Sequence, residues 1–331
     1  MSHSNSSLNS FANCMAKYKL GYIDHICEKD SPHLIFGSMA HEVLYKAGKL
    51  RDEYKDGVSI NEYKTIVPSE VIGEDLKDYF GIKSWEQYFV PVIKKVNEYE
   101  EKCVKELIDN YGSAEIEREI KLSISETELE QMGIFGIKQP LVGIIDLLIF
   151  NEKSAIIIDY KFSAKKKTQD DFDLNSQLYL YALFVHNKYN IPLKNIQVGY
   201  IDIPKQCFDT PTLLSSGVLS RSKSQNTSQE MYEKSVIAIH GEDDPCYNCK
   251  PGGYYYDCWC NLALNKVAYI TLQYLDLDIY NNIINDLFDA AKMIDHMIEN
   301  NLPFCKKYDS YSCKNCNYIN VCKPWLGVNN E

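Results

Sequence analysis

Glycine and proline are scarce in this chain of 331 residues, which has 16 glycines, 11 prolines and no internal repeat. Collagen-like, disordered and low-complexity proteins need the opposite composition, so these classes are excluded. No apolar run reaches the roughly 18 residues that span a bilayer, and the polar start MSHSNSSLNSF has no signal-peptide core. We therefore expect an intracellular, cytoplasmic protein in a reducing environment, with no membrane partner.

Basic residues are outnumbered by acidic ones, 35 to 46, and the formal net charge is −11. Such a chain repels phosphate on average, which excludes a broad basic face for passive duplex binding. Hydrophobic residues make up 45% and charged residues 24%, as in ordinary globular proteins. The length suits one elaborated domain or two modest ones, with a core that needs no disulfides.

Cysteine, by contrast, is abundant, with 12 residues. A reducing environment disfavours disulfides, so clustered cysteines indicate metal binding. The tail holds Cys313, Cys316 and Cys322 in a C-x₂-C-x₅-C pattern, three thiols that can converge on one centre but need a fourth ligand. Four thiolates bind either zinc or an iron–sulfur cluster, and the spacing does not decide between them.

Hydrophobic periodicity predicts a mixed α/β domain. Residues 141–150 and 155–162 are nearly all apolar, which is typical of strands buried on both faces, and a hairpin-like connection joins them. Further strands are expected at 116–122, 196–203 and 269–275. Helices are expected at 8–27, 34–50, 85–111 and 172–187, with a last helix capped by Asp278.

The order of elements predicts four parts. They are a helical N-terminal segment (1–113) that carries Cys14 and His41, a core (114–204), an insertion or arm with a second Cys-rich loop (205–265), and a C-terminal strand, helix and Cys-rich tail (266–331).

Two acidic residues stand inside the apolar strands, Asp146 and Asp159. On a strand, Asp159 and Lys161 point to one face, and an antiparallel partner brings Asp146 near them. Buried carboxylates need compensation, and two of them suit a hard cation such as Mg²⁺ or Mn²⁺, although a buried ion pair looks the same. A lysine beside such a metal can orient an attacking water.

Four short motifs in this region resemble those of the PD-(D/E)XK nuclease superfamily, in its RecB-like branch. They are Gly37-Ser-Met-Ala-His41, Gly143-Ile-Ile-Asp146, Asp159-Tyr160-Lys161 and Gln177-Leu-Tyr-Leu-Tyr181, and they occur in the family's order. The resemblance implies a restriction-endonuclease-like core, a mixed central sheet flanked by helices. It extends from about residue 6 to about residue 325.

The resemblance also implies roles for single residues. His41, Asp146, Asp159 and the Tyr160 carbonyl would be ligands of Mg²⁺ or Mn²⁺, and Lys161 would position the water. Gln177 and Tyr181, one helical turn apart, would hold the lysine or the DNA backbone. Glu119 precedes the two apolar strands and is read first as a solvated charge.

RecB-like nucleases of the AddB type, and CRISPR-associated relatives, join three tail cysteines to one near the N-terminus in a structural [4Fe–4S] cluster. Here Ser6, Leu8, Phe11 and Cys14 match the string that carries that cysteine, although Met15 replaces the usual proline. The resemblance thus implies a cluster on Cys14, Cys313, Cys316 and Cys322, with zinc as the alternative metal and Cys27 as a lesser alternative ligand.

A second group, Cys246, Cys249, Cys258 and Cys260, has the pattern C-x₂-C-x₈-C-x-C. It could bind another metal, or its members could be plain thiols. Positive charges near the carboxylates suggest a local DNA-binding lip. The candidate contacts there are Lys165, Lys166 and Lys167, although a solvated loop would look the same. Arg221 and Lys223 lie in a stretch that resembles a segment of many phage-type RecB-like nucleases, which could reach over bound DNA. Tyr254, Tyr255, Tyr256 and Trp259 could stack on unpaired bases or serve in packing.

We expect a metal-dependent DNA exonuclease that acts on single strands or DNA ends in recombination, repair or phage DNA processing, with a recombination or helicase partner. Two alternatives stay open. One is a structure-specific endonuclease with the same site, and the other is a non-catalytic DNA-binding subunit of a helicase–nuclease complex.

Overall fold

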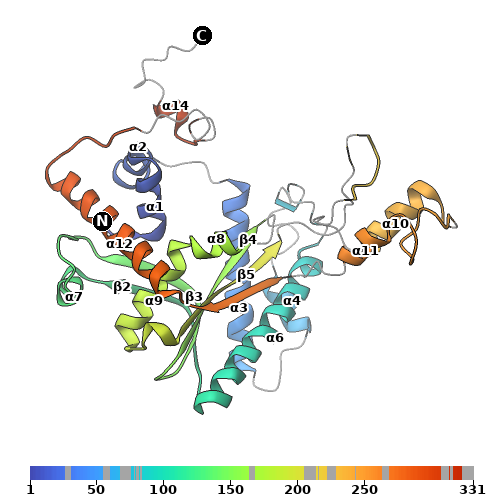
Figure 1. Ribbon diagram of the computed structural model, residues 1–331, viewed down its shortest axis with the longest axis horizontal. Helices are drawn as coiled ribbons and strands as arrows, with labels where there is room; N and C mark the ends of the chain where they lie inside the picture. The colour runs from blue at the N-terminus through green and yellow to red at the C-terminus, as the bar shows by residue number, and fades with distance from the viewer. Residues whose placement is uncertain are drawn as a thin grey trace, which may run out of the picture.

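A six-stranded mixed sheet forms the centre of the computed structural model (Figure 1), which confirms the expected α/β class. The main strands are β2 (Glu115–Ile124), β3 (Leu141–Phe150), β4 (Ala155–Ser163), β5 (Ile196–Pro204) and β6 (Tyr269–Tyr274). The structure describes residues 1–26, 31–54, 60–67, 76–77, 79, 82, 84–163, 168–204, 214, 216–221, 229–242, 244–262, 268–306, 313 and 316–322.

The direction in which neighbouring strands pair agrees with the segments that connect them. β2, β3 and β4 form an antiparallel meander, β4 pairs parallel with β5, and β5 pairs antiparallel with β6. A parallel pair needs a crossover, and here it consists of α8 (Gln169–Asp173) and α9 (Ser176–Tyr189). The two-residue strand β1 (His3–Ser4) pairs parallel with the first two residues of β3.

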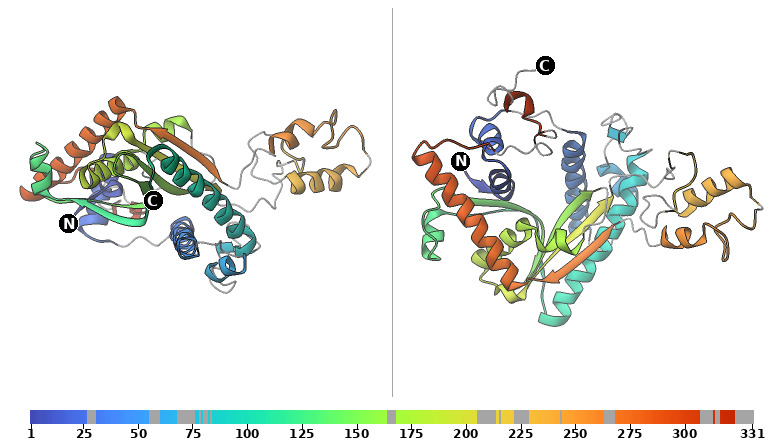
Figure 2. Two further views of the ribbon diagram at one scale, coloured as in Figure 1. Left: turned by 90° about the horizontal axis from the view of Figure 1, so that it is seen from below. Right: turned by 45° about the horizontal axis from the view of Figure 1, so that its top comes forward.

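Helices cover both faces of the sheet (Figure 2). On one face lie α1 (Asn5–Asn13), α9 and α12 (Leu277–Glu299), whose apolar side chains form one core with the strands. On the other face, α3 (Pro32–Glu53) and α6 (Trp85–Tyr111) form a second core. Because both faces are covered, β3 and β4 are apolar along most of their length, as their sequences predict.

Three helices of the structure differ in detail from the sequence predictions. The helix expected at 8–27 breaks at Cys14, whose backbone is extended (φ −161°), into α1, α2 (Met15–Tyr18) and a π-helical turn (Lys19–Ile23). The helix expected at 172–187 is split by Asn175, which caps α9. Helix α12 is capped by Asp276, not Asp278, because the Asp276 carboxylate accepts from two backbone N–H groups. Periodicity alone does not report such local capping.

Several short elements were not expected from the sequence: β1, α4 (Ile60–Ile66), α7 (Glu126–Gln131), a 3-10 turn (Leu193–Asn195), α10 (Gln229–His240), α11 (Tyr256–Leu262) and α14 (Ile319–Cys322). α10 and α11 stand apart from the sheet in each view and share a small core of their own (Figures 1 and 2). No helix in the described ranges is long and apolar enough to cross a membrane. The four-part division of the chain stays a prediction.

The N-terminus is held to α12 by a buried polar contact. His3 Nε2 lies 3.0 Å from Asp295 Oδ1, and both side chains are almost fully buried. Asp295 Oδ2 accepts from the backbone N–H groups of Lys138, at 2.6 Å, and Gln139. One carboxylate therefore joins β1, the segment before β3 and α12.

We expect Asp295→Ala to lower the free energy of unfolding by about 3 kcal/mol at neutral pH, because it leaves buried donors unpaired. Burial raises the pKa of Asp295, but His3 and the two N–H groups outweigh it and lower the pKa. The stabilisation is therefore complete above the unfolded-state pKa of about 3.9 and is lost as pH falls through the lower folded-state value. Urea denaturation at several pH values measures this.

Asp289→Ala is the matched control, because Asp289 is exposed on the same helix and, among the described residues, forms an ion pair with Lys292 alone, at 3.5 Å. It should change stability by less than about 1 kcal/mol. Equal losses in the two variants would contradict the prediction.

Candidate active site

The side-chain alternation of β2 and β3 resets at Glu119 and Asp146. On β3, Ile145 and Leu148 both face the α9 core, although a regular strand would place residues three apart on opposite faces. On β2, Ile116 packs with the α6 side and Ile120 with the α9 side. Glu119 has a left-handed backbone (φ 48°) and lies opposite Asp146, at the one position where the pairing of β2 with β3 is interrupted between Glu115 and Ile124.

Asp146 also lies where β3 has a gap in its pairing on the β4 side. Residues 141 and 142 pair with β1, and residues 147–150 pair with β4. The Asp146 carboxylate fills part of this gap, because its Oδ2 accepts from the Tyr160 backbone N–H at 2.8 Å. The gap thus directs an acidic side chain into a cleft instead of the core.

Asp159 and Lys161 project together from β4, as strand periodicity predicts. Asp159 is 2% exposed, and its Oδ2 lies 2.6 Å from Lys161 Nζ without the alignment of a hydrogen bond. Burial raises the pKa of Asp159 to about 6 against the opposing charge of Lys161, and Asp146 adds to the rise. The site therefore holds a buried carboxylate whose charged form lacks full compensation.

His41, on helix α3, lies beside the same carboxylates. Ser31 caps this helix and Pro32 occupies its first turn, both typical of a helix start. His41 Nδ1 lies 3.2 Å from Asp146 Oδ1. Burial lowers the pKa of His41, but the hydrogen bond and charge of Asp146 outweigh burial, so the pKa lies above its usual value.

A chain of hydrogen bonds holds the lysine from the other side. Lys161 Nζ donates to Gln177 Oε1 at 2.7 Å, and Gln177 Nε2 donates to Tyr181 Oη at 2.6 Å. Gln177 is in the first turn of α9, whose start is fixed by the Asn175 cap. The i, i+4 pair therefore faces the β4 side chains and restricts the position of the ammonium group.

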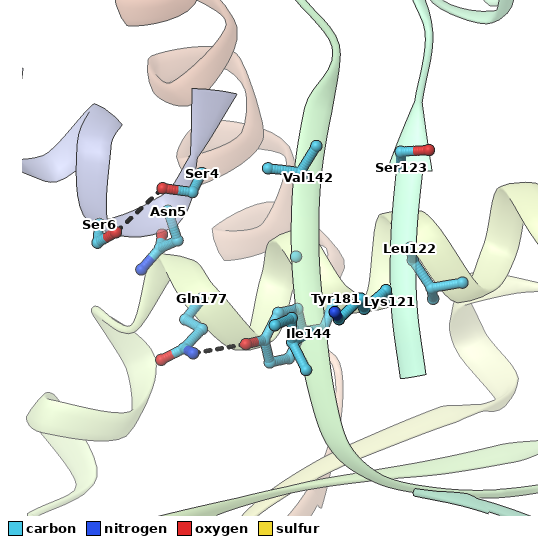
Figure 3. A pocket seen from close by; sticks show the side chains of 11 residues that line it. Ser4, Asn5, Ser6, Lys121, Leu122, Ser123, Val142, Ile144, Gln177 and Tyr181 are labelled. Carbon is cyan, nitrogen blue, oxygen red and sulfur yellow. Dashed lines mark hydrogen bonds between the residues drawn. The ribbon is translucent and has the colours of Figure 1, made fainter. Parts of the chain in front are cut away.

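Two adjoining cavities open at this cluster. The first, of about 480 Å³, is lined by the residues of the carboxylate cluster: His41, Glu119, Asp146, Asp159, Lys161, Gln177 and Tyr181, with others from α3. The second, of about 630 Å³, continues from Lys121, Ile144, Gln177 and Tyr181 to Ser4–Ser6 at the start of α1 (Figure 3). Together they form a groove beside the part of β3 that does not pair with β4.

Glu119 is exposed, as expected of a solvated charge, and it also lines the cleft. It lies in the first cavity, and burial and the charge of Asp146 raise its pKa. The sequence makes it a weaker candidate for the site than Asp146 or Asp159. Only the left-handed backbone of Glu119, which is uncommon for a non-glycine residue, marks the position, and a sequence does not display it.

The donor set fits a divalent cation in its chemistry. Asp146, Asp159 and His41 supply hard oxygen and imidazole ligands, and the buried Asp159 Oδ2 has no aligned hydrogen-bond donor. As placed, however, no three His, Cys, Asp or Glu side chains of the described ranges are grouped closely enough to hold a metal ion. Asp159 instead contacts Lys161, and Asp146 contacts His41.

Cys14 lies on the side of the described tail cysteines, but no three thiols of the described ranges are grouped closely enough to hold a metal ion. Burial raises the pKa of Cys322, and the thiols of Cys14, Cys313 and Cys316 raise it further. Tyr318 Oη donates to the Ile26 carbonyl at 3.3 Å, which docks the tail on the N-terminal segment. None of the ten cysteines that the structure describes forms a disulfide.

In the second cysteine group, Cys249 and Cys258 are buried and Cys246 is exposed. Burial, Glu233 and the thiols of Cys258 and Cys260 raise the pKa of Cys249 to about 12. Cys258 and Cys260 both lie on α11, where residues two apart point in widely different directions. A second metal site on these four thiols stays a prediction.

The predicted DNA contacts lie largely elsewhere. Lys165, Lys166, Lys167 and Lys223 fall outside the described residues, as does Cys27. Arg221 stacks on the Tyr254 ring at 3.8 Å and donates to the Tyr254 carbonyl, in the small α10–α11 unit and not in the cleft. Tyr255 is buried in that unit, so it cannot stack on a base as placed, whereas Tyr254 is exposed.

Comparison with known proteins gives one family. A model described as the PD-(D/E)XK nuclease superfamily matches residues 2–323. No curated protein matches the chain.

Similarity to solved structures is distant. A "Putative exonuclease" from Eubacterium rectale is 9% identical, with a TM-score of 0.46 and coverage of 100% of this chain and 90% of its own. The protein SSO0001 is 13% identical, with a TM-score of 0.27 and coverage of 95% and 94%. Both are too remote in sequence and shape to bear on activity.

Proposed function

Because the chain belongs to the PD-(D/E)XK nuclease superfamily, we propose that it is a metal-dependent DNA exonuclease that acts on single strands or free ends. The observation that carries the proposal is the cluster of Asp146, Asp159 and Lys161 beside an open cleft. The RecB-like order of its motifs supports a role in recombination, repair or phage DNA processing.

Asp146, Asp159, His41 and the Tyr160 carbonyl would hold Mg²⁺ or Mn²⁺ in this site. When bound, such a cation neutralises charge on the phosphate and lowers the pKa of a water. Lys161 would then leave its contact with Asp159 and donate to the attacking water or to a phosphate oxygen. Gln177 keeps the ammonium within reach of this position, and Tyr181 fixes Gln177 in turn.

The second cavity extends this site along a path for a DNA strand. Lys121 lines both cavities, and Ser4–Ser6 present hydroxyl and amide groups at the far end. The N–H groups at the start of α1 also favour an anion. A groove of about 630 Å³ is within the size range of small-ligand sites, which suits a short stretch of unpaired strand.

We also propose that Cys14, Cys313, Cys316 and Cys322 hold a [4Fe–4S] cluster. The contact of Tyr318 in the tail with the Ile26 carbonyl, which brings the tail to the N-terminal segment, supports it. Cys14 directly follows α1, the helix whose first residues line the second cavity. A cluster at this point would fix the tail and a wall of the groove together.

Purified protein should degrade linear DNA in the presence of Mg²⁺ or Mn²⁺ and lose at least about 100-fold in kcat in Lys161→Ala and Asp159→Asn. Lys153→Ala is the control, because Lys153 is exposed in the β3–β4 connection. Gel assays with end-labelled oligonucleotides measure the loss. Wild-type rates in both site variants would contradict the assigned roles.

An exonuclease should leave circular single-stranded DNA intact while it degrades the same sequence after linearisation. The two substrates differ only in having ends, so equal degradation of both would establish endonuclease activity and reject the exonuclease proposal.

Lys121→Ala should raise KM for a single-stranded oligonucleotide about tenfold, the equivalent of one charge-assisted hydrogen bond to phosphate. The change should grow as salt is lowered, since the contact is electrostatic. Steady-state kinetics at several salt concentrations test it, with Lys153→Ala again as the control. An unchanged KM would remove Lys121 from the strand path.

Protein purified without oxygen should be brown, with about four iron atoms per chain and broad absorbance near roughly 400 nm from sulfur-to-iron charge transfer. Cys316→Ser should lose the iron and the colour. A colourless protein with stoichiometric zinc would replace the cluster and leave the nuclease proposal intact.

A further inference from the structure

Behind the carboxylate cluster lies a buried ionic network with Glu100 of α6 at its centre. Glu100 is 1% exposed, and its Oε2 accepts from Arg118 at 2.8 Å and contacts Arg51 at 2.6 Å. Its Oε1 accepts from Tyr160 Oη at 2.7 Å and from Arg118 at 3.2 Å. One carboxylate thus receives donors from α3, β2 and β4.

The network is balanced in charge. Arg118, whose side chain is 3% exposed, also donates to both carboxylate oxygens of Asp52, at 2.8 and 3.2 Å. Two guanidinium groups therefore face two carboxylates. Burial raises the pKa of Asp52, but the hydrogen bonds and charge of Arg118 outweigh burial and lower it. A buried ionic network is costly to desolvate and often adds little stability over apolar side chains, so its presence calls for another explanation.

Two partners of Glu100, Tyr160 and Arg118, are next to residues of the cleft, and the third, Arg51, shares a helix with one. Tyr160 stands between Asp159 and Lys161, and its backbone N–H donates to Asp146. Arg118 precedes Glu119, the left-handed residue of β2. Arg51 is ten residues after His41 on the same helix, about 15 Å along its axis.

The surface of α3 leaves space for the Arg118 side chain of this network. Gly48 lies between His41 and Arg51 on α3, and a Cβ at this position would overlap the guanidinium of Arg118. A helix-interior glycine costs about 1 kcal/mol relative to alanine. The absence of a side chain here lets β2 and α3 approach closely enough for Arg118 to reach Asp52.

From these contacts we propose that Glu100 is a positioning residue for the metal site. It fixes α3 against β2 and β4, and so fixes His41 relative to Asp146 and Asp159. Glu100 touches neither metal nor substrate, and it acts through Arg51, Arg118 and Tyr160. The proposal rests on the proposed function only in assuming that the cleft binds a divalent cation.

The test measures binding of Mn²⁺ to the metal-free full-length protein, by electron paramagnetic resonance of the free ion. Glu100→Gln keeps the shape of the side chain and removes its charge. We expect Mn²⁺ affinity to fall about 10- to 100-fold, the range seen when residues that orient metal ligands are replaced. Circular dichroism and thermal melting establish that the variant is folded at the assay temperature.

Glu98→Gln is the matched control. It makes the same substitution on the same helix, but Glu98 is exposed, and within the part of the chain that the structure describes its ion pair is with Lys95, at 3.3 Å. Mn²⁺ affinity and melting temperature should stay at wild-type values.

Two milder variants cover the case in which Glu100→Gln does not fold. Tyr160→Phe removes one hydroxyl and leaves the charges in balance, and Gly48→Ala displaces the Arg118 guanidinium. Both should weaken Mn²⁺ binding several-fold, in proportion to a displaced α3. Folded variants with wild-type Mn²⁺ affinity and a lower melting temperature would assign the network to stability alone and overturn the proposal.

The outcome is separable from that of the nuclease proposal. If wild-type protein binds Mn²⁺ but cleaves no DNA, the nuclease proposal fails and the positioning role is still measured. If it cleaves DNA and Glu100→Gln binds Mn²⁺ normally, only the positioning role fails.

Discussion

The structure depends on the burial of charge inside an apolar sheet. Asp159 sits in a strand whose neighbours are almost all aliphatic, and the cost of desolvating a lone carboxylate is several kcal/mol or more. Lys161 on the same strand contacts Asp159, His41 from α3 contacts Asp146, and Gln177 from α9 accepts a hydrogen bond from Lys161. These three side chains come from different elements, so the sheet and both helix layers must be in place before the site exists.

A second ionic group, behind the carboxylate cluster, also compensates buried charges. Glu100, Arg118, Arg51 and Asp52 neutralise one another between α6, β2 and α3. Tyr160 connects the two groups, since its side chain donates to Glu100 and its backbone N–H donates to Asp146. The same residue therefore lies in the buried network and in the cleft, which is how packing between helices can reach the geometry of the carboxylates.

The net charge of the whole chain and the charges at the cleft have opposite implications for binding of nucleic acid. A net charge of −11 disfavours contact with nucleic acid. In the cleft, however, the carboxylates are the groups that a divalent cation would neutralise, and Lys161 and Lys121 line the same cavity. Acidic composition therefore excludes binding by a broad basic face but not binding at one local site.

The sequence determined much by itself. Apolar runs with period-breaking turns predicted β3, β4 and β5 almost to the residue, and the long helix Trp85–Tyr111 matched its prediction. Strand periodicity placed Asp159 and Lys161 on one face, and motif order led to the family that the family model also identifies. Such features are local, because each depends on residues within a few positions of one another.

Tertiary structure alone decided the rest. The reset of β2 and β3 that turns Glu119 and Asp146 into the cleft depends on a left-handed residue whose conformation no pattern signals. The contact of Tyr318 with Ile26, and of His3 with Asp295, joins positions about 300 residues apart. Glu100 looked like any other charge on an amphipathic helix, and only the packing of α3, β2 and β4 around it makes it central. Contacts between distant segments are set by how whole elements pack, which local periodicity cannot specify.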